Sequence, residues 1–534
     1  MDDNIRDSKN WEYIDAYFNR PNGGLVQHQL DSFNDFFSTG LPQLFRERNP
    51  VTLIKDKDAT TGEFNLTCHL YFGGKDGTRV YYGKPTISTD DGNRIMYPNE
   101  ARLMNYTYAF TIHYDVEVEY LMKQADGEIV KKEGLLEKVF LGRFPVMMHS
   151  NMCILSQLDP EIRFGMGEGR NDPGGYFIVD GKEKVIVSQE KFADNALYLR
   201  KDVGDLYSLS AEIRSVSEDA AKPTRSLSVR VVGATPTMDN GQIVVLVPNV
   251  RKPVPLFILM RALGIISDKA IIETCVLDIK RYEKFLEFFR PSIHDAGPIF
   301  TQAGAIRYIG SLTKGKTTAH ANEILSDYLL PHMGELNYRE KALYVGYMVI
   351  RLLNMQHGAE VPTDRDSFTY KRVELAGSLL QGLFKEYYIL QQRDIFVKLD
   401  KEYYYHESSY KRNFPALVEN NARDVFKDRI VETGVRKGFK GNWGSQDRTK
   451  RPGLVQDLSR LSFNSMLSQL RKINLPLDPS AKVVGPRYLH STQWGIIDPV
   501  DTPDGGNIGL HKHMAIGAYI TSTCSGVPVT KLLI

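Results

Sequence analysis

Hydrophobic residues near the N-terminus recur every three or four positions. Trp11, Ile14 and Phe18 form one series, and Leu30 and Phe33 begin a second one. This spacing corresponds to one turn of an α-helix, so each series lies on one helix face. The first forty residues are therefore predicted to form amphipathic helices.

The spacing changes to a period of two between residues 52 and 140. Runs such as residues 108–120 alternate apolar with polar side chains, and Asp-Gly turn signals separate the runs. Alternation of this kind predicts β-strands. Residues 174–181 predict a further strand that ends in a tight turn, and residues 184–188 predict the second strand of a hairpin.

Helical spacing returns in the middle of the chain. Strands predicted at residues 226–232 and 242–246 give way to helical patterns over residues 254–356. A second helical section is predicted over residues 364–432. The sequence therefore predicts an α+β multidomain fold, with mixed helical and antiparallel-strand domains.

The length of the chain predicts several domains. A single hydrophobic core stops growing beyond roughly 250–300 residues, and the chain has 534. The changes in pattern place boundaries near residues 195, 365 and 435. The predicted domains are 1–195, 196–365, 366–434 and 435–534.

Apolar spacing between Gly453 and Ile473 predicts one long helix. Its buried stripe would contain Leu454, Leu458, Leu461, Met466, Leu470 and Ile473. Another face would present Gln456, Arg460, Phe463, Asn464, Leu467 and Arg471. Amide and guanidinium groups on one face, with loops at 442–452 and 475–485 on either side, favour a surface that follows a nucleic-acid backbone. A strand is predicted next, with Arg487, His490 and Trp494.

The charge of the chain is uneven in this region. The net charge is only +2, but nine Lys and Arg residues face two Asp residues between Arg436 and Lys472. Such an excess is typical of a surface that binds phosphate groups. Charge taken alone is also explained by a solvated face.

Composition excludes several classes of protein. Hydrophobic residues make up 42% and charged residues 25% of the chain, which is ordinary for a folded soluble protein. No apolar run approaches the ~18 residues that cross a bilayer, and the acidic N-terminus lacks the apolar core of a secretory signal. We therefore expect a soluble intracellular protein without a membrane partner.

The cysteines do not form a recognisable site. Cys68, Cys153, Cys275 and Cys524 are scattered, without a Cys-x-x-Cys pair. Structural zinc sites use closely spaced ligands, and disulfides require an oxidising compartment. Neither a zinc site nor a disulfide is predicted.

The segment from Gly310 to Thr317 matches the phosphate-loop pattern G-x-x-x-x-G-K-T. In a nucleotide site this loop follows a buried strand and opens a helix. The preceding residues 303–309 contain Arg307 and have a helical pattern. A basic loop between two helices is the favoured interpretation, and an independent nucleotide-binding protein is the alternative.

A dense set of carboxylates lies at residues 498–505, Asp-Pro-Val-Asp-Thr-Pro-Asp-Gly. Two-metal catalysis needs carboxylates that converge on ions about 4 Å apart, whereas two prolines favour an extended backbone that separates them. His511 and His513 could share a strand face, but no third ligand is near them in the sequence. No metal site is predicted here.

Four motifs stand close together in the C-terminal part of the chain. They are Gly-Asn-Trp-Gly at 441–444, Leu-Ser-Gln-Leu-Arg-Lys at 467–472, Pro-Arg-Tyr-Leu-His-Ser-Thr-Gln-Trp-Gly at 486–495 and Pro-Val-Asp-Thr-Pro-Asp-Gly at 499–505. They resemble the fork region of the second-largest (beta-type) subunit of multisubunit DNA-directed RNA polymerases. The resemblance is closest to the eukaryotic and archaeal type.

The resemblance continues in collinear order over nearly the whole chain. Residues 24–34, 98–103, 142–145 and 174–190 are similar to the protrusion domain, residues 261–266 to the lobe, and residues 364–377 to the return into the protrusion. It implies a protrusion over 1–195 and 366–434, a lobe over 196–365 and an incomplete fork over 435–534.

Charge and resemblance together predict the functional residues. Nucleic-acid contacts are expected at Arg448, Lys450, Arg451, Gln456, Arg460, Arg471, Lys472, Arg487 and His490. The resemblance places Arg487 and Asp501 near the active centre. Asp501 and Asp504 occupy positions where the family usually has glutamate, so each carboxylate is one methylene shorter.

The resemblance implies the N-terminal portion of a nucleotidyltransferase subunit, which shapes the DNA/RNA cleft and fork during transcription. The catalytic Mg²⁺ of the family is held mainly by the largest subunit, so no catalytic residue and no cofactor is expected in this chain alone. Expected partners are the largest and other polymerase subunits, the C-terminal part of the second-largest subunit, template DNA and the RNA–DNA hybrid.

The family's subunit continues beyond the fork into hybrid-binding, wall and clamp segments. The present sequence stops at Ile534, so we expect a split-gene product or a fragment that does not polymerise alone. A nucleic-acid-binding fragment without enzymatic context is a further alternative.

Overall fold

The computed structural model describes residues 2–18, 24–57, 62–89, 92–123, 128–217, 222–234, 240–446, 450–521 and 526–533. The chain divides into two compact units. Unit 1 contains Met1–Lys191 and Arg372–Ile534, and unit 2 contains Phe192–Lys371. Residues on both sides of the boundary predicted near 435 lie in unit 1. The assignment of these parts to protrusion, lobe and fork stays a prediction.

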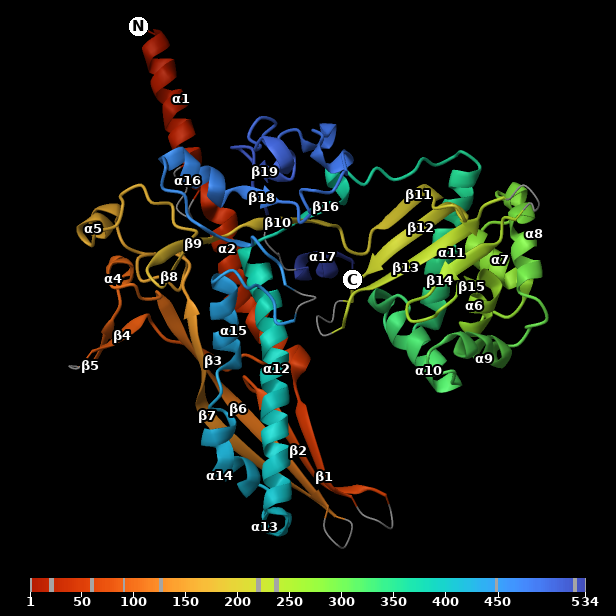
Figure 1. The fold of residues 1–534 in the computed structure, drawn as a ribbon, viewed down its shortest axis with the longest axis horizontal. Helices are drawn as coiled ribbons and strands as arrows, with labels where there is room; N and C mark the ends of the chain where they lie inside the picture. The colour runs from red at the N-terminus through yellow and green to blue at the C-terminus, as the bar shows by residue number, and fades with distance from the viewer. Residues whose placement is uncertain are drawn as a thin grey trace. The chain divides into compact units, whose positions relative to one another are not determined.

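Unit 1 combines helices with several sheets (Figure 1). Its helices are α1 Asp2–Phe18, α2 Gln27–Asp35, α3 Leu41–Arg48, α4 Pro98–Leu103, α5 Pro160–Gly165, α12 Ala376–Tyr405, α13 Glu407–Arg412, α14 Ala416–Val425, α15 Ile430–Phe439, α16 Phe463–Leu470 and α17 Val527–Leu533. Its strands are β1 Val51–Lys57, β2 Phe64–Phe72, β3 Val80–Tyr82, β4 Thr86–Thr89, β5 Gly92–Ile95, β6 Ala109–Lys123, β7 Ile129–Pro145, β8 Phe177–Val179, β9 Lys182–Ile186, β10 Ser188–Phe192, β16 Lys371–Glu374, β17 Val455–Asp457, β18 Lys472–Asn474 and β19 His511–His513.

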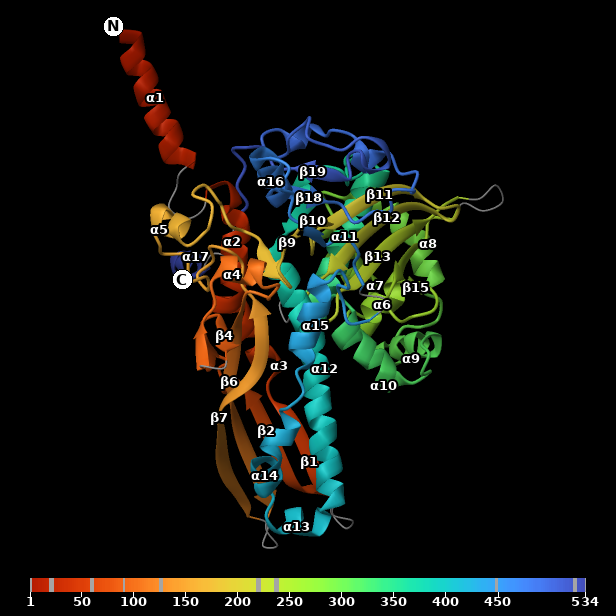
Figure 2. The same cartoon turned by 60° about the vertical axis from the view of Figure 1, so that its left-hand side comes forward.

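The main sheet of unit 1 supports the long helix α12. Strands β1, β2, β6 and β3 are neighbours in that order, and β7 also pairs with β6. Both views show α12 running along this sheet (Figures 1 and 2). The alternation of buried and exposed residues along β2 follows from side chains that point to opposite faces of a strand.

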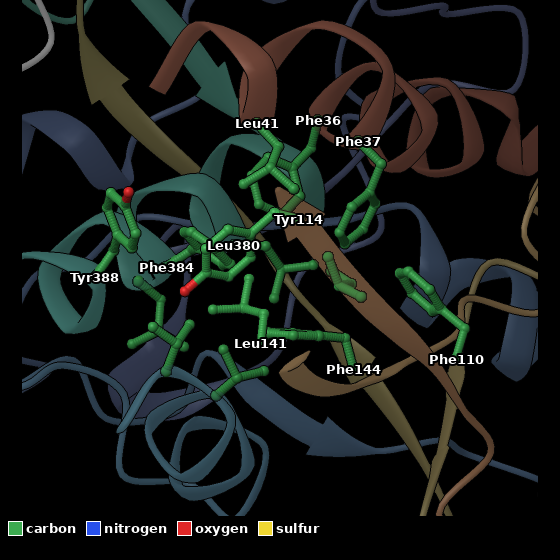
Figure 3. Close-up of a cluster of buried hydrophobic side chains, with 14 of the residues drawn as sticks. Phe36, Phe37, Leu41, Phe110, Tyr114, Leu141, Phe144, Leu380, Phe384 and Tyr388 are labelled. Atoms are coloured by element: carbon green, nitrogen blue, oxygen red, sulfur yellow. The ribbon is translucent and has the colours of Figure 1, made fainter. Parts of the chain in front are cut away.

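Aromatic side chains fill the space between α12, the sheet and the N-terminal helices. Figure 3 shows this cluster, with labelled residues Phe36, Phe37, Leu41, Phe110, Tyr114, Leu141, Phe144, Leu380, Phe384 and Tyr388. Phe37 meets Phe110 edge to face, with ring centroids 5.1 Å apart. Edge-to-face pairs add stabilisation to the burial of apolar area. The predicted N-terminal helices and the strands between residues 52 and 140 are therefore confirmed, with α12 as their common partner.

The predicted hairpin at 174–188 is confirmed as β8 and β9. Its turn, Asp180-Gly181, has positive φ at both residues, 48° and 76°, as a tight two-residue hairpin turn requires. A Cβ on Gly181 would lie 2.6 Å from the side-chain oxygen of Asn105, so glycine is required here. The helix predicted from residue 364 is wrong at its start. It begins only at Ala376, because residues 371–374 form β16 beside β10.

Unit 2 is a five-stranded antiparallel sheet with helices. Its strands are β11 Leu197–Val203, β12 Tyr207–Ser215, β13 Arg225–Val232, β14 Ile243–Leu246 and β15 Val254–Pro255, paired in that order. Its helices are α6 Leu256–Ala262, α7 Asp268–Val276, α8 Leu286–Asp295, α9 Gln302–Leu312, α10 Thr318–Glu323 and α11 Tyr338–Gln356. The strands predicted near 226–232 and 242–246 are confirmed, whereas β11 and β12 were not predicted.

The α+β prediction is confirmed by this combination of helices and antiparallel sheets. No helix in the described ranges is long and apolar enough to cross a membrane. Cys68, Cys153 and Cys275 are buried free thiols, and Cys524 lies outside the described residues.

Two glycines of α12 provide a test of how closely this helix packs. A Cβ on Gly377 would lie 1.8 Å from the Ser32 carbonyl oxygen in α2, whereas a Cβ on Gly382 meets nothing within 4 Å. We expect Gly377→Ala to destabilise unit 1 by about 1–3 kcal/mol through steric strain. Gly382→Ala should stabilise it by about 0.5–1 kcal/mol, because alanine loses less backbone entropy in a helix.

Urea unfolding followed by tryptophan fluorescence measures this difference. All three tryptophans, Trp11, Trp443 and Trp494, belong to unit 1, so the signal reports that unit. Equal effects of the two substitutions would contradict the close approach of α12 to α2.

Candidate nucleic-acid interface

The segment between Gly453 and Ile473 is not the single helix that its apolar spacing predicts. It forms β17, a loop, the short helix α16 and β18. β17 pairs antiparallel with β9, with Gln456 opposite Val185. The Ser462 hydroxyl begins α16 by accepting a hydrogen bond from the backbone of its first turn. The long-helix prediction is therefore wrong, because strand pairing overrides the local spacing.

The residues predicted for the two faces of that helix also lie elsewhere than expected. Most of its apolar stripe is buried, but Leu461 is 90% exposed. Gln456 lies on a strand, where its amide donates to the Gly453 carbonyl at 3.2 Å, and Arg460 lies on a loop. The strand expected around Arg487 is likewise wrong. The region contains two short 3-10 turns, Gly485–Arg487 and Ser491–Gln493.

Arg460 is held by an acidic and aromatic cluster. Its guanidinium donates two hydrogen bonds to the Glu183 carboxylate, both 2.7 Å long. Arg102 donates to the same carboxylate at 2.9 Å and to Glu168 at 2.7 and 2.8 Å. The Tyr176 hydroxyl accepts from Arg102 at 2.8 Å. The charge of Arg460 is thus paired within unit 1, and the cluster fixes the loop before α16.

Arg471 is 6% exposed and binds backbone carbonyl groups instead of carboxylates. Its guanidinium donates to the Leu25 oxygen at 2.5 Å and to the Ala515 oxygen at 2.6 Å. Gln29 lies in the same region, and its amide donates to the Leu470 carbonyl at 3.3 Å. Arg471 therefore joins the residues before α2 to the end of α16 and to the segment after β19.

A small sheet attaches the C-terminal segment to the rest of unit 1 (Figure 2). β18 pairs parallel with β10 and antiparallel with β19. Across this sheet Lys512 donates to Glu190 at 2.8 Å, with side-chain exposures of only 7% and 2%. Lys472 lies on β18 and is half-buried. Burial lowers its pKa from the ordinary value, and the Asp501 carboxylate acts in the opposite direction.

The basic loop at 442–452 is closed at its base. Trp443 is buried and forms an isolated bridge with Arg451, whose guanidinium also donates to Glu374 at 3.3 Å. Lys450 is exposed next to it. Arg448 lies outside the described residues. The described base of the loop is therefore held against α12 and α15.

Arg487 holds the loop at 475–485 through hydrogen bonds to backbone carbonyl groups. Its guanidinium donates to Gly506 at 2.6 Å, to Pro479 at 2.9 Å and to Ile508 at 3.1 Å. His490 shares a hydrogen bond of 2.7 Å with the Thr492 hydroxyl. The structure thus brings the loop at 475–485 together with the turn at 505–508.

The carboxylates of residues 498–504 do not converge. Asp498 accepts the backbone N–H groups of Val500 and Asp501, and these bonds lower its pKa. Asp501 accepts from the Ser468 hydroxyl at 2.7 Å and lies 3.2 Å from His513. Within the described residues, no group of three or more His, Cys, Asp and Glu side chains could hold a metal ion. These residues do not fit a catalytic magnesium site.

The phosphate-loop pattern has the wrong surroundings for a nucleotide site. Gly310 lies inside α9, and Thr317 caps α10 by accepting the His320 N–H. The pattern therefore runs from the last turn of α9 to the start of α10 instead of following a strand. The alternative of an independent nucleotide-binding protein receives no support from this geometry.

Two cations were not among the predicted contact residues. Lys437 and Lys482 are exposed, and neither forms an ion pair with any described residue. Lys437 belongs to the basic run that starts at Arg436, and Lys482 lies in the loop at 475–485. Their positions could be read from the sequence, but their unpaired charge could not.

The burial of His28 beside Arg471 generates a pH prediction. Burial lowers the pKa of His28 from 6.5 to about 3, and the charge of Arg471 acts in the same direction. Below pH 6.5 the unfolded chain therefore binds a proton that folded His28 does not bind. Stability is lost as pH falls from 6.5 toward 3, by about 2 kcal/mol at pH 5 relative to pH 7.

The measurement compares urea unfolding of the unsubstituted chain and His28→Asn at pH 7 and pH 5 by tryptophan fluorescence. We expect the substitution to remove about 2 kcal/mol of the pH dependence. A merely destabilising substitution lowers stability equally at both pH values. An unchanged difference between pH 7 and pH 5 would refute the neutral buried histidine.

The chain is similar to known proteins over most of its length. Residues 24–419 match the family described as "RNA polymerase beta subunit", and residues 456–520 match "RNA polymerase Rpb2, domain 3". DNA-directed RNA polymerase II subunit 2 of Arabidopsis thaliana is 33% identical over the whole chain, and RPB2 of Encephalitozoon cuniculi is 35% identical over 98% of it. The chain spans 45% and 44% of those two relatives.

An archaeal relative has nearly the same extent. DNA-directed RNA polymerase subunit Rpo2N of Methanocaldococcus jannaschii is 31% identical over 98% of this chain and 97% of its own length. The matched segments include the N-terminal part that Arg471 joins and the C-terminal part that contains Arg471. The chain therefore belongs to the RNA polymerase beta subunit family and corresponds to the N-terminal portion of the second-largest subunit.

Proposed function

We propose that this chain forms part of the DNA/RNA cleft of a multisubunit RNA polymerase inside the cell and supplies its fork loops during template-directed RNA synthesis. The observation that carries the proposal is the collinear family match over residues 24–419 and 456–520. The relatives are named as DNA-directed RNA polymerase subunits.

The contribution of this chain would be positioning and electrostatics. The loops at 442–452 and 475–485 start from bases that Trp443, Arg451 and Arg487 hold in place. A base that is already in place lowers the cost of ordering a loop when it positions a bound nucleic acid. The bond-forming chemistry would belong to Mg²⁺ held mainly by the largest subunit.

We propose two kinds of role for the predicted contact residues. Arg448 and Lys450 would meet nucleic-acid phosphates directly, together with the unpaired Lys437 and Lys482. The guanidinium of Arg451, which is 54% exposed beside its ion pair with Glu374, would do the same. Gln456, Arg460, Arg471, Lys472, Arg487 and His490 would mainly shape the surface, because their side chains are engaged with, or half-buried in, unit 1. Asp501 would hold α16 against β19 near the active centre.

The proposed partners are the largest polymerase subunit, the other polymerase subunits and the C-terminal part of the second-largest subunit. Copurification with these chains tests the enzymatic context. We expect one complex that contains this chain and extends RNA on a DNA template, whereas this chain alone should not. A chain that stays monomeric with all other subunits present would refute the proposal and leave a binding fragment without enzymatic context.

The direct phosphate contacts are tested by salt dependence. Lys450→Gln with Arg451→Gln should lower the slope of log affinity against log salt by about 0.7–0.9 per lost contact on an RNA–DNA scaffold. Lys132→Gln with Lys401→Gln is the matched control, because both lysines are exposed in unit 1 and outside the loops. Equal slopes for both double variants would rule out the assigned loop contacts.

A further inference from the structure

Unit 2 contains a basic surface that the fork does not explain. Two turns contribute to it, one between β14 and β15 and one between α9 and α10, which are neighbours in the fold (Figure 1). The turns meet at an isolated antiparallel bridge between Val250 and Thr313. The Arg251 N–H donates to the Leu312 carbonyl at 3.1 Å next to it.

Four cations project from these bridged turns. Arg251 and Lys252 follow Val250, and Lys314 and Lys316 follow Thr313, and all four are exposed. We call these four residues the two-turn patch. No described residue forms an ion pair with any of them. Their charges are therefore uncompensated, in contrast to Arg460.

The sequence around each turn contains no acid. Residues 240–267 and 296–322 include neither Asp nor Glu. In the sequence these are two separate stretches, and neither is strongly basic. The bridge brings them together, so a local excess of positive charge exists only in the folded unit. Such an excess raises the local concentration of anions.

The backbone that presents these charges is fixed. Thr313 is fully buried. Its hydroxyl donates to the Gly310 carbonyl at 2.7 Å and accepts the Lys316 N–H at 3.2 Å. On the other turn, the Val250 N–H donates to the Val247 carbonyl at 3.2 Å. The backbone positions that carry the cations are therefore set before any partner binds.

The residue types of the two-turn patch indicate which class of partner it binds. Protein interfaces usually contain aromatic or large apolar anchors, and none is exposed among residues 247–253 or 311–317. Single-stranded nucleic acid is bound with stacking aromatic side chains, which these turns also lack. Exposed cations on turns without such anchors suit regularly spaced phosphates.

We propose that the two-turn patch binds the phosphate backbone of double-stranded DNA, independently of base sequence. This contact lies in unit 2 and does not depend on the loops of unit 1. It also gives a role to Lys314 and Lys316, the two lysines of the phosphate-loop pattern, without a bound nucleotide.

Lysine acetylation footprinting on the full chain tests the contact residue by residue. Duplex DNA of mixed sequence should slow the acetylation of Lys252, Lys314 and Lys316 several-fold. Lys280 and Lys284 are exposed elsewhere in unit 2 and should react at unchanged rates. Equal protection of all five lysines, or no protection, would overturn the proposal.

Poly-glutamate at equal charge concentration distinguishes DNA from an acidic protein segment. Protection by poly-glutamate that equals protection by DNA would overturn the assignment to DNA. Weak or absent protection by poly-glutamate supports it. The acetylation of Lys450 is measured in the same experiment. Contacts by the loops of unit 1 and contacts by the two-turn patch are therefore tested separately.

A pair of substitutions gives an independent measurement. Lys314→Gln with Lys316→Gln should lower the slope of log affinity against log salt by about 0.9 per lost contact for duplex DNA. Lys280→Gln with Lys284→Gln removes the same charge from unit 2 and should leave the slope unchanged. Equal slopes in the two double variants would overturn the proposal.

Discussion

The buried guanidinium of Arg471 is the interaction on which the arrangement of unit 1 depends most. It donates to the carbonyl of Leu25, which lies 446 positions before Arg471 in the sequence, and also to the carbonyl of Ala515. Its partners are neutral carbonyl groups, so it carries a buried charge that only hydrogen bonds compensate. Losing one of these acceptors while the guanidinium stays buried would leave part of its hydrogen-bonding capacity unsatisfied, which is costly for a charged group. The residues before α2 and the C-terminal segment are therefore held to the same side chain.

The same constraint explains the neighbouring side chains. His28 stays neutral because it is buried beside Arg471. The ion pair between Lys512 and Glu190 closes the small sheet from the other side. Together these side chains join the N-terminal part of unit 1 to the C-terminal segment. A scaffold that positions loops suits the proposed role, in which the loops contact nucleic acid.

The free charge of a basic residue in this chain depends on whether the fold places an acidic partner beside it. Arg460 is basic in the sequence but is compensated by Glu183, which lies 277 positions away. Lys314 belongs to a pattern that suggests a nucleotide, yet in the fold its turn joins that of Lys252, and neither lysine forms an ion pair with a described residue. Counting basic residues along the sequence therefore overestimates the free positive charge around Arg460 and misses the two-turn patch.

The sequence by itself determined the elements whose partners are local. The hairpin turn at Asp180-Gly181, the N-terminal helices and the strand-rich region follow from nearby residues, and the collinear motifs identified the family. Only the tertiary structure decided the rest. β17 became a strand because β9 pairs with it, although the spacing from Gly453 to Ile473 is helical. Arg471 became a buried anchor and Arg251 became a neighbour of Lys314, because distant segments supply their surroundings, and local spacing carries no information about such partners.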